Sequence, residues 1–501
     1  MSKNLYELFQ SRFPANRSSV FMETEAGRIF SYGDLDAEVA ATAAALTALG
    51  ALPGDRVAAQ VEKSPEAVFL YLACLKAGLI FLPLNPAYAD DEVAYFVGDA
   101  EPLLFVCVPG REDDIHRLSG AHKVMVMSLG QARDGSFAVH TTEFAGGVHD
   151  TAVCAADDVA AILYTSGTTG RPKGAMITHG NLASNALALH EVWGFKSDDV
   201  LLHALPIFHV HGLFVALNTT LVGGTGLLFL ERFSPDAVMA HLPHATVFMG
   251  VPTYYTRLLA RAEFDGDLCA NMRLFISGSA PLLEETFAAF ETRTGHRILE
   301  RYGMTETGMN TSNPLDGERL PGTVGFPLPG IVLRVVGDDG KTLGAGEIGV
   351  LQLTGPNVFK GYWRMPEKTE EDFTDDGFFV TGDMATIDET GRAAIVGRAK
   401  DLIISGGLNV YPKEIEALID EIEGVVESAV VGAPDDDFGE QVVAFIVAEG
   451  GAVNEAAVMA ALSGRLARYK RPKAIRFVGD LPRNAMGKVQ KNLLRDDFAA
   501  E

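Results

Sequence analysis

The chain has 501 residues, of which 48% are hydrophobic and 21% charged, and a formal net charge of −25. This length exceeds what one hydrophobic core supports, so two or more domains are expected, and the composition excludes extended disorder. The net charge argues against a nucleic-acid partner, because the average surface field repels phosphates.

The chain also lacks the usual signals for export or membrane insertion. Its four cysteines are scattered without metal-ligand spacing, and its N-terminus carries no apolar core of signal-peptide length. The longest apolar run, residues 67–84, is broken by Lys76, Gly78 and Pro83. We therefore expect a cytoplasmic protein with reduced thiols and no membrane association.

Helical and strand patterns alternate through most of the chain. Ser31 and Asp34 form a capping pair for a helix that runs to about Gly50, and a turn then leads into a strand over 56–61. Similar units recur near 67–82, 96–108 and 181–230. This alternation predicts layered α/β domains.

A domain boundary is expected where an apolar strand ends in a charged stretch near 395–401. Beyond it, the pattern predicts a helix from Pro412 to Gly424, strands over 425–433 and 441–448, and a helix over 454–468. These elements make a compact α+β unit. Residues 465–488 contain eight Lys or Arg and one Asp, which on pattern alone indicates a solvated basic face.

The most informative stretch is YTSGTTGRPKG, residues 164–174, which follows an apolar strand over 159–163. Its glycines let the backbone approach a ligand, its hydroxyls and amides suit phosphate oxygens, and Arg171 and Lys173 supply positive charge. It is not a Walker A loop, because Lys173 follows Pro172 and precedes Gly174. The stretch predicts a phosphate-binding loop.

This string resembles the phosphate-binding signature of the adenylate-forming superfamily, which comprises acyl-CoA synthetases, luciferases and peptide-synthetase adenylation domains. Six further strings match the superfamily in its order: PIFHVHG (206–212), SGSAPL (277–282), ERYGMTET (300–307), FFVTGD (378–383), GRAKDLIISGGLNVYPKEIE (397–416) and PRNAMGKVQK (482–491). The resemblance implies an α/β fold with a large N-terminal domain over 1–396, made of two α/β layered subdomains and a distorted β-barrel. It also implies a hinge over 397–401 and a small, mobile α+β domain over 402–501.

The resemblance implies a reaction in two steps. A carboxylate attacks the α-phosphate of ATP to give an acyl-adenylate and pyrophosphate, and a thiol, usually that of coenzyme A, then displaces AMP. The first step joins two anions, so it requires positive charge and the exclusion of water. By resemblance, Glu306 is a Mg²⁺ ligand, Tyr302 stacks against adenine, and Asp383 binds the ribose hydroxyls. The nucleotide-binding residues that the resemblance implies are Thr165, Ser166, Gly167, Thr168, Thr169, Gly170, Lys173, Gly278, Ser279, Ala280, Glu300, Arg301, Tyr302, Gly303, Thr305, Asp383 and Arg398.

The catalytic residues implied in the same way are Lys488, Lys173, Glu306 and Thr165. Lys488 matches the superfamily's catalytic lysine, a point charge able to stabilise the bond-forming state. Its surroundings also resemble a lysine-acetylation site, so an acetyltransferase and a deacetylase are expected partners. Rotation about Lys400 would withdraw Lys488 and bring in the coenzyme A residues, namely Ser405, Gly406, Gly407, Leu408, Arg468 and Lys470, with further phosphate contacts from Arg465, Arg471 and Lys473.

The acyl pocket is expected to include His209, His211, Arg257, Ser277, Met304 and Met309. A buried guanidinium at Arg257 would bind a second carboxylate, and a monocarboxylate would leave it unpaired. The alternative for Arg257 is an arginine at a helix surface. Across nearly the whole chain, including NVFKGYWRMPEKT (357–369), the sequence resembles the malonate-activating members of the superfamily, which implies malonate as substrate, with methylmalonate as another acceptable acid.

Other functions stay open at this stage. A short-chain, medium-chain or aryl acid is the alternative substrate. A regulatory protein that binds the nucleotide without turnover is an alternative of another class, although the presence of Lys488 and Glu306 argues against it. An adenylation domain that loads a carrier protein would need an adjoining carrier module, for which the sequence after Lys488 has no room.

Overall fold

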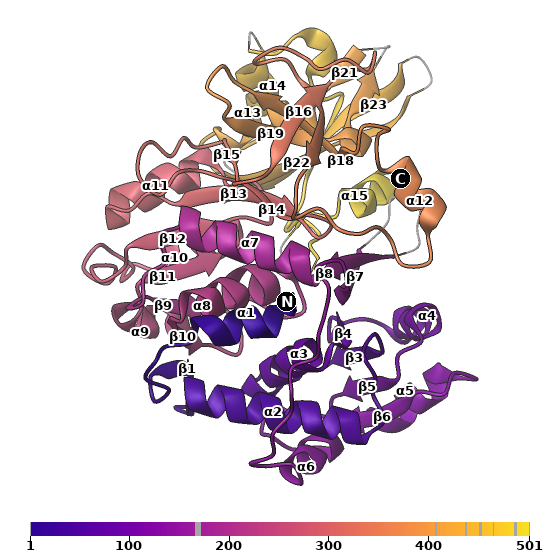
Figure 1. Ribbon diagram of the computed structural model, residues 1–501. Helices are drawn as coiled ribbons and strands as arrows, with labels where there is room; N and C mark the ends of the chain where they lie inside the picture. Colours follow the sequence, from indigo (N-terminus) through magenta and orange to yellow (C-terminus); the bar gives the residue numbers. More distant parts are fainter. Residues whose placement is uncertain are drawn as a thin grey trace.

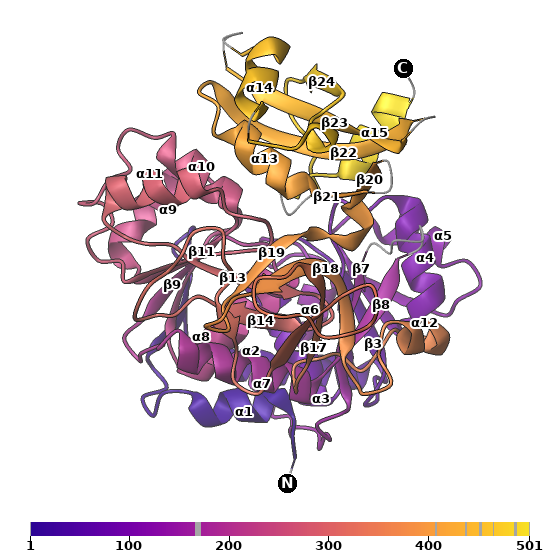
Figure 2. The same ribbon diagram turned by 90° about the horizontal axis from the view of Figure 1, so that it is seen from above.

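The computed structural model describes residues 2–165, 172–405, 408–435, 438–449, 453–463, 465–484 and 488–499. It shows a mixed α/β architecture with a large domain and a smaller one at its C-terminal end (Figure 1). The predicted fold class is confirmed. Figure 2 shows the small domain and the C-terminus on the opposite side of the molecule from the N-terminus.

The first layer of the large domain is a six-stranded sheet. Its strand order is β6 (Met125–Ser128), β5 (Leu104–Cys107), β3 (Arg56–Gln60), β4 (Ile80–Pro83), β7 (Val159–Thr165) and β8 (Lys173–Thr178). Its pairs are parallel except for β7 with β8, which form an antiparallel pair. The helices in this part of the chain are α2 (Tyr32–Ala48), α3 (Pro65–Ala77), α4 (Asp90–Ala100), α5 (Glu112–Ser119) and α6 (Ser136–Thr142).

Two of these helices show how the sequence sets their ends. Helix α2 starts with the predicted capping box, in which the side chains of Ser31 and Asp34 each bond the other's backbone N–H. Helix α3 is buried over its whole length, is capped by Ser64 and ends at Gly78 with φ of 70°. Apart from Glu66 and Lys76 near its ends, its side chains are mostly apolar on every face, and such a helix must be enclosed, so α3 lies in the main core of the large domain.

The second layer is a nine-stranded sheet. Its order is β15 (Phe326–Pro327), β14 (Gly308–Ser312), β13 (Leu299–Met304), β12 (Leu274–Ser277), β11 (Val247–Gly250), β9 (Val200–His203), β10 (Gly226–Phe229), β1 (Val20–Thr24) and β2 (Ile29–Ser31). The strands from β13 to β1 are parallel, and β14, β15 and β2 extend the sheet in antiparallel fashion. The helical segments here are α1 (Leu5–Arg12), α7 (His179–Val192), a π-helix (His211–Leu217), α8 (Asn218–Gly223), α9 (Pro235–His241), a 3₁₀ turn (Leu242–His244), α10 (Pro252–Leu259) and α11 (Glu284–Thr294).

A third, antiparallel sheet is formed by the part of the large domain that follows the second layer in the chain. It consists of β16 (Val332–Val336), β17 (Gly349–Thr354), β18 (Phe379–Ile387) and β19 (Ala393–Arg398), with α12 (Pro366–Glu371) between β17 and β18. A bridge between Gly325 and Ala393 connects its edge strand β19 to the chain just before β15. The third sheet therefore continues the second one around the site described below.

The small domain begins after a 3₁₀ turn at Ala399–Asp401. Its sheet has the order β21 (Leu408–Val410), β20 (Ile403–Ser405), β23 (Gly439–Ala448) and β22 (Val425–Asp435), and β24 (Ala474–Phe477) pairs with β23. Its helices are α13 (Pro412–Asp420), α14 (Glu455–Leu462) and α15 (Lys491–Ala499), with a 3₁₀ turn at Arg468–Lys470. The predicted helix over 454–468 is wrong at its C-terminal end, because α14 stops at Leu462 and Ser463 adopts an extended backbone.

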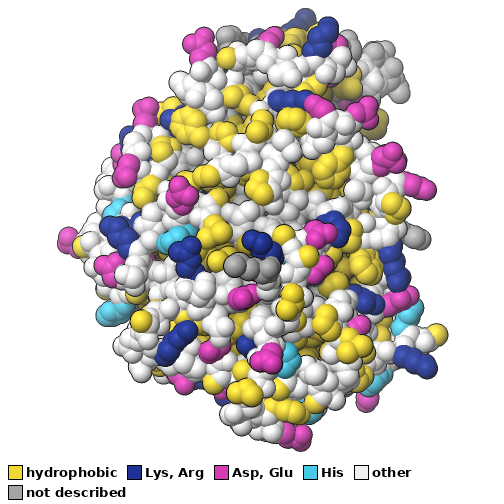
Figure 3. Space-filling view, in the orientation of Figure 1, with side chains coloured by type: hydrophobic (Ala, Val, Ile, Leu, Met, Phe, Trp, Pro, Cys, Tyr) yellow, Lys and Arg dark blue, Asp and Glu magenta, His cyan; other side chains and the backbone are white. Residues whose placement is uncertain are grey.

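Strand membership changes between Arg398 and Ile403, on either side of the predicted hinge. The domain limits 1–396, 397–401 and 402–501 stay predictions. Over the described ranges, no helix combines the length and apolarity needed to cross a bilayer. Figure 3 shows acidic and basic side chains interspersed over the face of the molecule seen in Figure 1.

Candidate active site

The site lies at the carboxyl ends of strands from the first two layers, where ligands bind in open α/β sheets. On the first layer, the β7–β8 pair places Thr165 opposite Lys173. The predicted phosphate-binding residues Ser166, Gly167, Thr168, Thr169 and Gly170 connect these two strands and lie outside the described residues. The pairing of Thr165 with Lys173 thus defines the base of the predicted phosphate loop.

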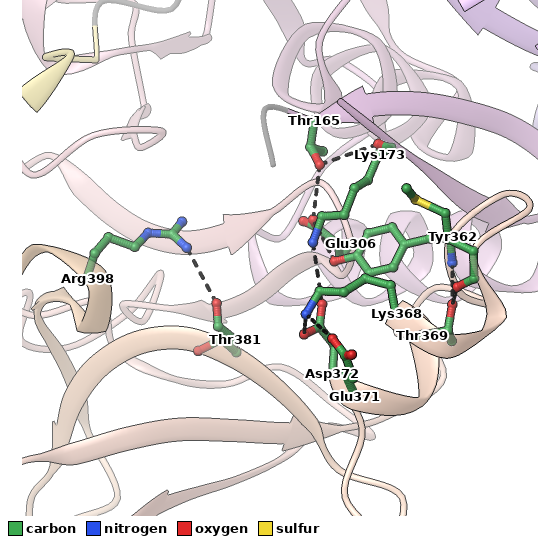
Figure 4. A network of polar contacts seen from close by, with 11 residues as sticks. Thr165, Lys173, Glu306, Tyr362, Lys368, Thr369, Glu371, Asp372, Thr381 and Arg398 are labelled. Carbon is green, nitrogen blue, oxygen red and sulfur yellow. Dashed lines mark hydrogen bonds and ion pairs between the residues drawn. The ribbon is translucent and has the colours of Figure 1, made fainter. Parts of the chain in front are cut away.

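Lys173 is buried and surrounded by groups that sequence reasoning did not single out. Its ammonium lies 4.2 Å from the ring centroid of Tyr362 and 3.5 Å from a carboxylate oxygen of Asp372. Asp372 is bound in turn by Lys368 at 2.8 Å, one helical turn away. Figure 4 shows these side chains converging beneath Thr165 and Glu306. The signal for Tyr362 was the GYWRMPEKT string, but no pattern indicated the role of Asp372.

Glu306 is the acidic group of this cluster. It is buried, and its Oε1 accepts hydrogen bonds from Tyr362 at 3.3 Å and from Thr165 at 3.5 Å. Burial is the largest influence on Glu306 and raises the pKa of its carboxyl, while Lys173 and Arg398 act in the opposite direction. A buried carboxylate with incomplete charge compensation is a suitable partner for a hard cation that takes its remaining oxygens from phosphate and water. Glu306 therefore fits the role of Mg²⁺ ligand that the resemblance implies.

Asp383, the predicted ribose-binding residue, lies at the bulge of β18 and contacts two other predicted nucleotide-binding residues, Arg398 and Tyr302. It lies 2.7 Å from Nε of Arg398 and accepts a hydrogen bond from the hydroxyl of Tyr302, and its backbone N–H donates to Thr381. Burial raises the pKa of Tyr302, and Asp383 raises it further. The predicted proximity of Arg398 to Asp383 is confirmed, while the stacking of Tyr302 on adenine stays a prediction.

Lys488 faces this same cluster from the small domain. Two hydrogen bonds join it to Asn484: the side chain of Asn484 accepts one from the backbone N–H of Lys488 at 3.0 Å, and the backbone N–H of Asn484 donates one to the carbonyl of Lys488 at 2.9 Å. The residue is exposed overall, but its ammonium end is desolvated next to large-domain residues. This desolvation, with the nearby cation Arg398, lowers the pKa of Lys488 to about 8, against the opposing effect of Asp383.

The ion pairs that hold the chain on either side of Lys488 were not predicted. Arg483 pairs with Glu427 before Lys488, and Lys491 pairs with Glu416 at 2.5 Å after it. Glu416 also accepts the backbone N–H of Val430 in β22. These contacts fasten both ends of the lysine segment to the small-domain sheet, so Lys488 moves with that domain.

A buried guanidinium lies on the second layer, but it is not the one predicted. Arg301 in β13 is buried, and its Nε and Nη2 have no hydrogen-bond partner within the described part of the chain. Burial lowers the pKa of Arg301 to about 9, although Tyr255 and Glu300 raise it. Gly278 makes room for this group, since a Cβ there would lie 2.4 Å from Nη1 of Arg301. A buried cation without a partner among the described residues fits a site for an anionic group.

Further buried polar atoms surround Arg301. His211 is buried, its Nδ1 lies 3.2 Å from the hydroxyl of Ser279, and its Nε2 is without a described partner. Burial and the positive charge of Arg301 lower the pKa of His211, so the ring is neutral. The hydroxyl of Ser277 is likewise buried and unpaired among described residues, and Ser279 has a φ of 72°. A strained backbone beside unpaired polar atoms is typical of a ligand site.

The predicted burial of Arg257 is wrong. Arg257 is exposed on α10, next to Tyr254, as in the alternative given above. The helix starts at Pro252 and turns its buried face, with Tyr255 and Leu258, toward the second core. Position 257 therefore points outward. The family resemblance placed Arg257 in the pocket, but only the helix orientation decides which side it faces.

The other predicted acyl residues lie at the ends of neighbouring strands. Met309 is buried in β14, while Met304 at the end of β13 and His209 are half-buried. Burial lowers the pKa of His209 to about 4. Gly303 requires its lack of a side chain, because a Cβ would lie 2.2 Å from the carbonyl oxygen of Gly308. The tight β13–β14 pair thus brings Met304 and Met309 next to each other, with Met309 opposite Gly303 and Met304 opposite Gly308.

A cavity of about 240 Å³ lies between the first two layers. Its walls include Phe81 and Pro83 on one side and Pro206, Ile207 and Phe208 on the other. The cavity adjoins the segment that carries His209, but neither Arg301 nor Glu306 lines it. We therefore place the chemistry at the cluster of Glu306, Asp383 and Lys488 and not in this cavity.

The comparisons with known proteins agree with this geometry. The sequence-family model for AMP-binding enzymes matches residues 8–363, and the family model for the AMP-binding enzyme C-terminal domain matches residues 414–488. The chain belongs to the family of AMP-binding enzymes. The resemblance inferred from the seven sequence strings is thereby confirmed.

Individual relatives align with most or nearly all of this enzyme. It is 52% identical to MatB from Rhodopseudomonas palustris, whose ATP-bound structure superposes with a TM-score of 0.96 over 99% of both chains. The apo structure of that protein superposes with a TM-score of 0.86 at 53% identity. A malonate–CoA ligase from Arabidopsis thaliana is 36% identical over 89% of this chain and 78% of its own.

The enzyme superposes better on the ATP-bound structure than on the apo structure of the same relative. This agrees with the position of Lys488, whose ammonium lies within electrostatic reach of Arg398 and Asp383. The structure therefore represents the orientation in which Lys488 faces the nucleotide side of the site.

The predicted coenzyme A residues do not form one surface in this orientation. Ser405 is buried and Leu408 is exposed, whereas Gly406 and Gly407 lie outside the described residues. Several cations of the basic segment have partners inside the small domain: Arg465 with Glu421, Lys470 with Glu414, and Lys473 with Asp435. Arg468 and the hinge candidate Lys400 are exposed.

Proposed function

We propose that this enzyme is an AMP-forming acyl-CoA ligase that converts malonate, ATP and coenzyme A into malonyl-CoA, AMP and pyrophosphate. A malonate oxygen attacks the α-phosphorus of ATP, and the bond to pyrophosphate breaks. The coenzyme A thiol then attacks the carbonyl carbon of malonyl-adenylate, loses its proton and displaces AMP. Methylmalonate is a further substrate under this proposal, because one extra methyl changes affinity only modestly.

The observation that carries the substrate assignment is the unpaired, buried guanidinium of Arg301. A dicarboxylate presents one carboxylate to the α-phosphate and has a second one to neutralise this cation bidentately. A monocarboxylate of the same size would leave Arg301 buried and unpaired, which is costly. The neutral ring of His211 and the hydroxyl of Ser277 are available as further hydrogen-bonding groups. Arg301 thus takes over the role that the sequence assigned to Arg257.

The first half-reaction uses the groups around Lys173 and Lys488. Lys173 would exchange its contact with Asp372 for phosphate oxygens, and Thr165 would add a hydroxyl beside it. Lys488, positively charged at neutral pH, would stabilise the charge that develops between the carboxylate and the α-phosphate. Mg²⁺ bound at Glu306 would neutralise phosphate charge. Asp383 and Arg398 would hold the ribose and so fix the α-phosphate near Lys488.

A panel of acids tests the proposal directly. Thioester formation is measured with ATP, Mg²⁺ and coenzyme A for malonate, methylmalonate, succinate, propionate, octanoate and benzoate. Malonate should give the highest kcat/KM, with propionate far below it because it lacks the second carboxylate. If propionate or benzoate equals malonate, the substrate assignment fails while the AMP-forming ligase remains. If no acid yields thioester, the non-catalytic nucleotide-binding protein becomes the better assignment.

Two finer expectations belong with this proposal. Acetylation of Lys488 by a lysine acetyltransferase would remove the charge that the first half-reaction uses, and a deacetylase would restore it. The ammonium of Lys488 is desolvated against the large domain in this orientation, so such an enzyme would need the small domain to move away first. We also propose a cytoplasmic location, on the sequence signals given above.

A further inference from the structure

The contact between the two domains includes a lysine that no sequence pattern singled out. Lys413, in the first turn of α13, donates a hydrogen bond of 3.1 Å to the carbonyl oxygen of Ile395. Lys413 belongs to the small domain, whereas Ile395 lies in β19, the edge strand of the third sheet. This hydrogen bond therefore crosses the predicted hinge.

The position of Ile395 in β19 explains why its carbonyl oxygen can accept this hydrogen bond from Lys413. Strand β19 pairs with β18 on one side, its other side is bridged to Gly325 at Ala393, two residues before Ile395, and its register shifts between Ile395 and Gly397. A bulge at a sheet edge leaves a backbone group without its ladder partner. In this orientation, Lys413 supplies the missing donor.

A second group of the large domain attracts Lys413. Glu300 in β13 is buried, its Oε1 accepts a hydrogen bond of 3.3 Å from the backbone of Leu282, and its Oε2 has no partner among the described residues. Lys413 is the strongest electrostatic influence that stabilises the Glu300 carboxylate, ahead of Arg301, while Glu284 opposes it. On the small-domain side, the neighbouring Glu414 is bound by Lys470 at 2.7 Å, so it does not compete strongly for Lys413.

We propose that Lys413 is a positioning residue that holds the small domain in the adenylating orientation through the Ile395 carbonyl and Glu300. Lys488 is fastened to the same small domain, and its ammonium faces Arg398 and Asp383 in this orientation. Rotation of the small domain for the second half-reaction would separate Lys413 from β19. Lys413 therefore favours the first half-reaction and must release its contacts before the second one.

The test separates the two half-reactions of the proposed function, on which this inference rests. Lys413→Met retains the side-chain length and removes the charge and the donor. ATP–pyrophosphate exchange with malonate should fall about tenfold, the effect of losing one charge-assisted hydrogen bond. Thioester formation from prepared malonyl-adenylate should be unchanged or faster. Lys413→Arg, which keeps charge and donors, should restore most of the exchange.

Lys123→Met is the matched control, because Lys123 is exposed just before β6, the outermost strand of the first layer of the large domain. Small-angle scattering in the presence of a non-hydrolysable ATP analogue adds a readout independent of rates. The wild-type curve should match this structure, and the Lys413→Met curve should deviate from it. Unchanged exchange, or equal losses in both half-reactions, would overturn the proposal. If wild-type enzyme does not activate malonate, the same tests are run with the acid that it does activate, so the two failures are distinguishable.

Discussion

Replacement of Arg301 by methionine gives the sharpest test of the substrate assignment. The lowering of the Arg301 pKa from 12.5 to about 9 corresponds to about 4–5 kcal/mol by which burial disfavours the charged form. A carboxylate ligand that pairs with Arg301 recovers part of this free energy. Since each 1.4 kcal/mol is about a factor of ten, the largest discrimination from this source is about a thousandfold.

The expected result is a fall of roughly 10²–10³ in kcat/KM for malonate. Propionate, which lacks the second carboxylate, should be used as well as before or better, because the substituted pocket no longer holds an unpaired charge. The free Arg301→Met enzyme should also unfold at a higher temperature than wild type, since an uncompensated buried cation is removed. Steady-state kinetics with both acids and thermal unfolding without ligand measure these effects.

Arg257→Ala serves as the control, because this side chain is exposed on α10. Its effect on malonate should stay below about tenfold, as is usual for a solvent-exposed charge. The reasoning is refuted if Arg301→Met keeps its malonate kcat/KM within about threefold of wild type. A large loss for Arg257→Ala with little change for Arg301→Met would return the specificity role to the exposed arginine.

Three further predictions concern the small domain. Lys488→Ala should abolish ATP–pyrophosphate exchange yet still form thioester from prepared acyl-adenylate; exchange at the wild-type rate would contradict its role. Because the pKa of Lys488 is lowered to about 8 and the protonated form is the active one, kcat/KM for the first half-reaction should decline as pH rises through about 8. The decline of kcat itself should lie at higher pH, because bound triphosphate stabilises the protonated form of Lys488 and so raises its pKa. A pH-independent exchange rate between 7 and about 9.5 would show that this ammonium is not required. Lys400→Pro should slow thioester formation much more than exchange, because proline fixes φ where the chain must turn; equal losses would argue against a hinge at Lys400.

Much of the nucleotide side could be predicted from the sequence, because its signals are local. The spacing of Thr165 and Lys173 on either side of a glycine-rich sequence, the carboxylate of Glu306 and the capping box of α2 each depend on residues a few positions apart. Local backbone geometry and hydrogen bonding decide such features. The structure brings Arg398 beside Asp383 because both belong to the adjacent strands β18 and β19.

The acyl side and the domain contact depended on the tertiary structure. Whether an arginine is buried follows from which face its helix or strand turns to the core, and packing left Arg257 exposed and Arg301 buried. The contact of Lys413 with Ile395 is decided by how two domains meet, although the two residues are near in sequence. The sequence by itself determined the chemistry that this enzyme carries, through motifs whose residues act with their neighbours. Only packing decided which charges lose their water, and that loss gives Arg301, Glu300 and Lys488 their altered proton affinities.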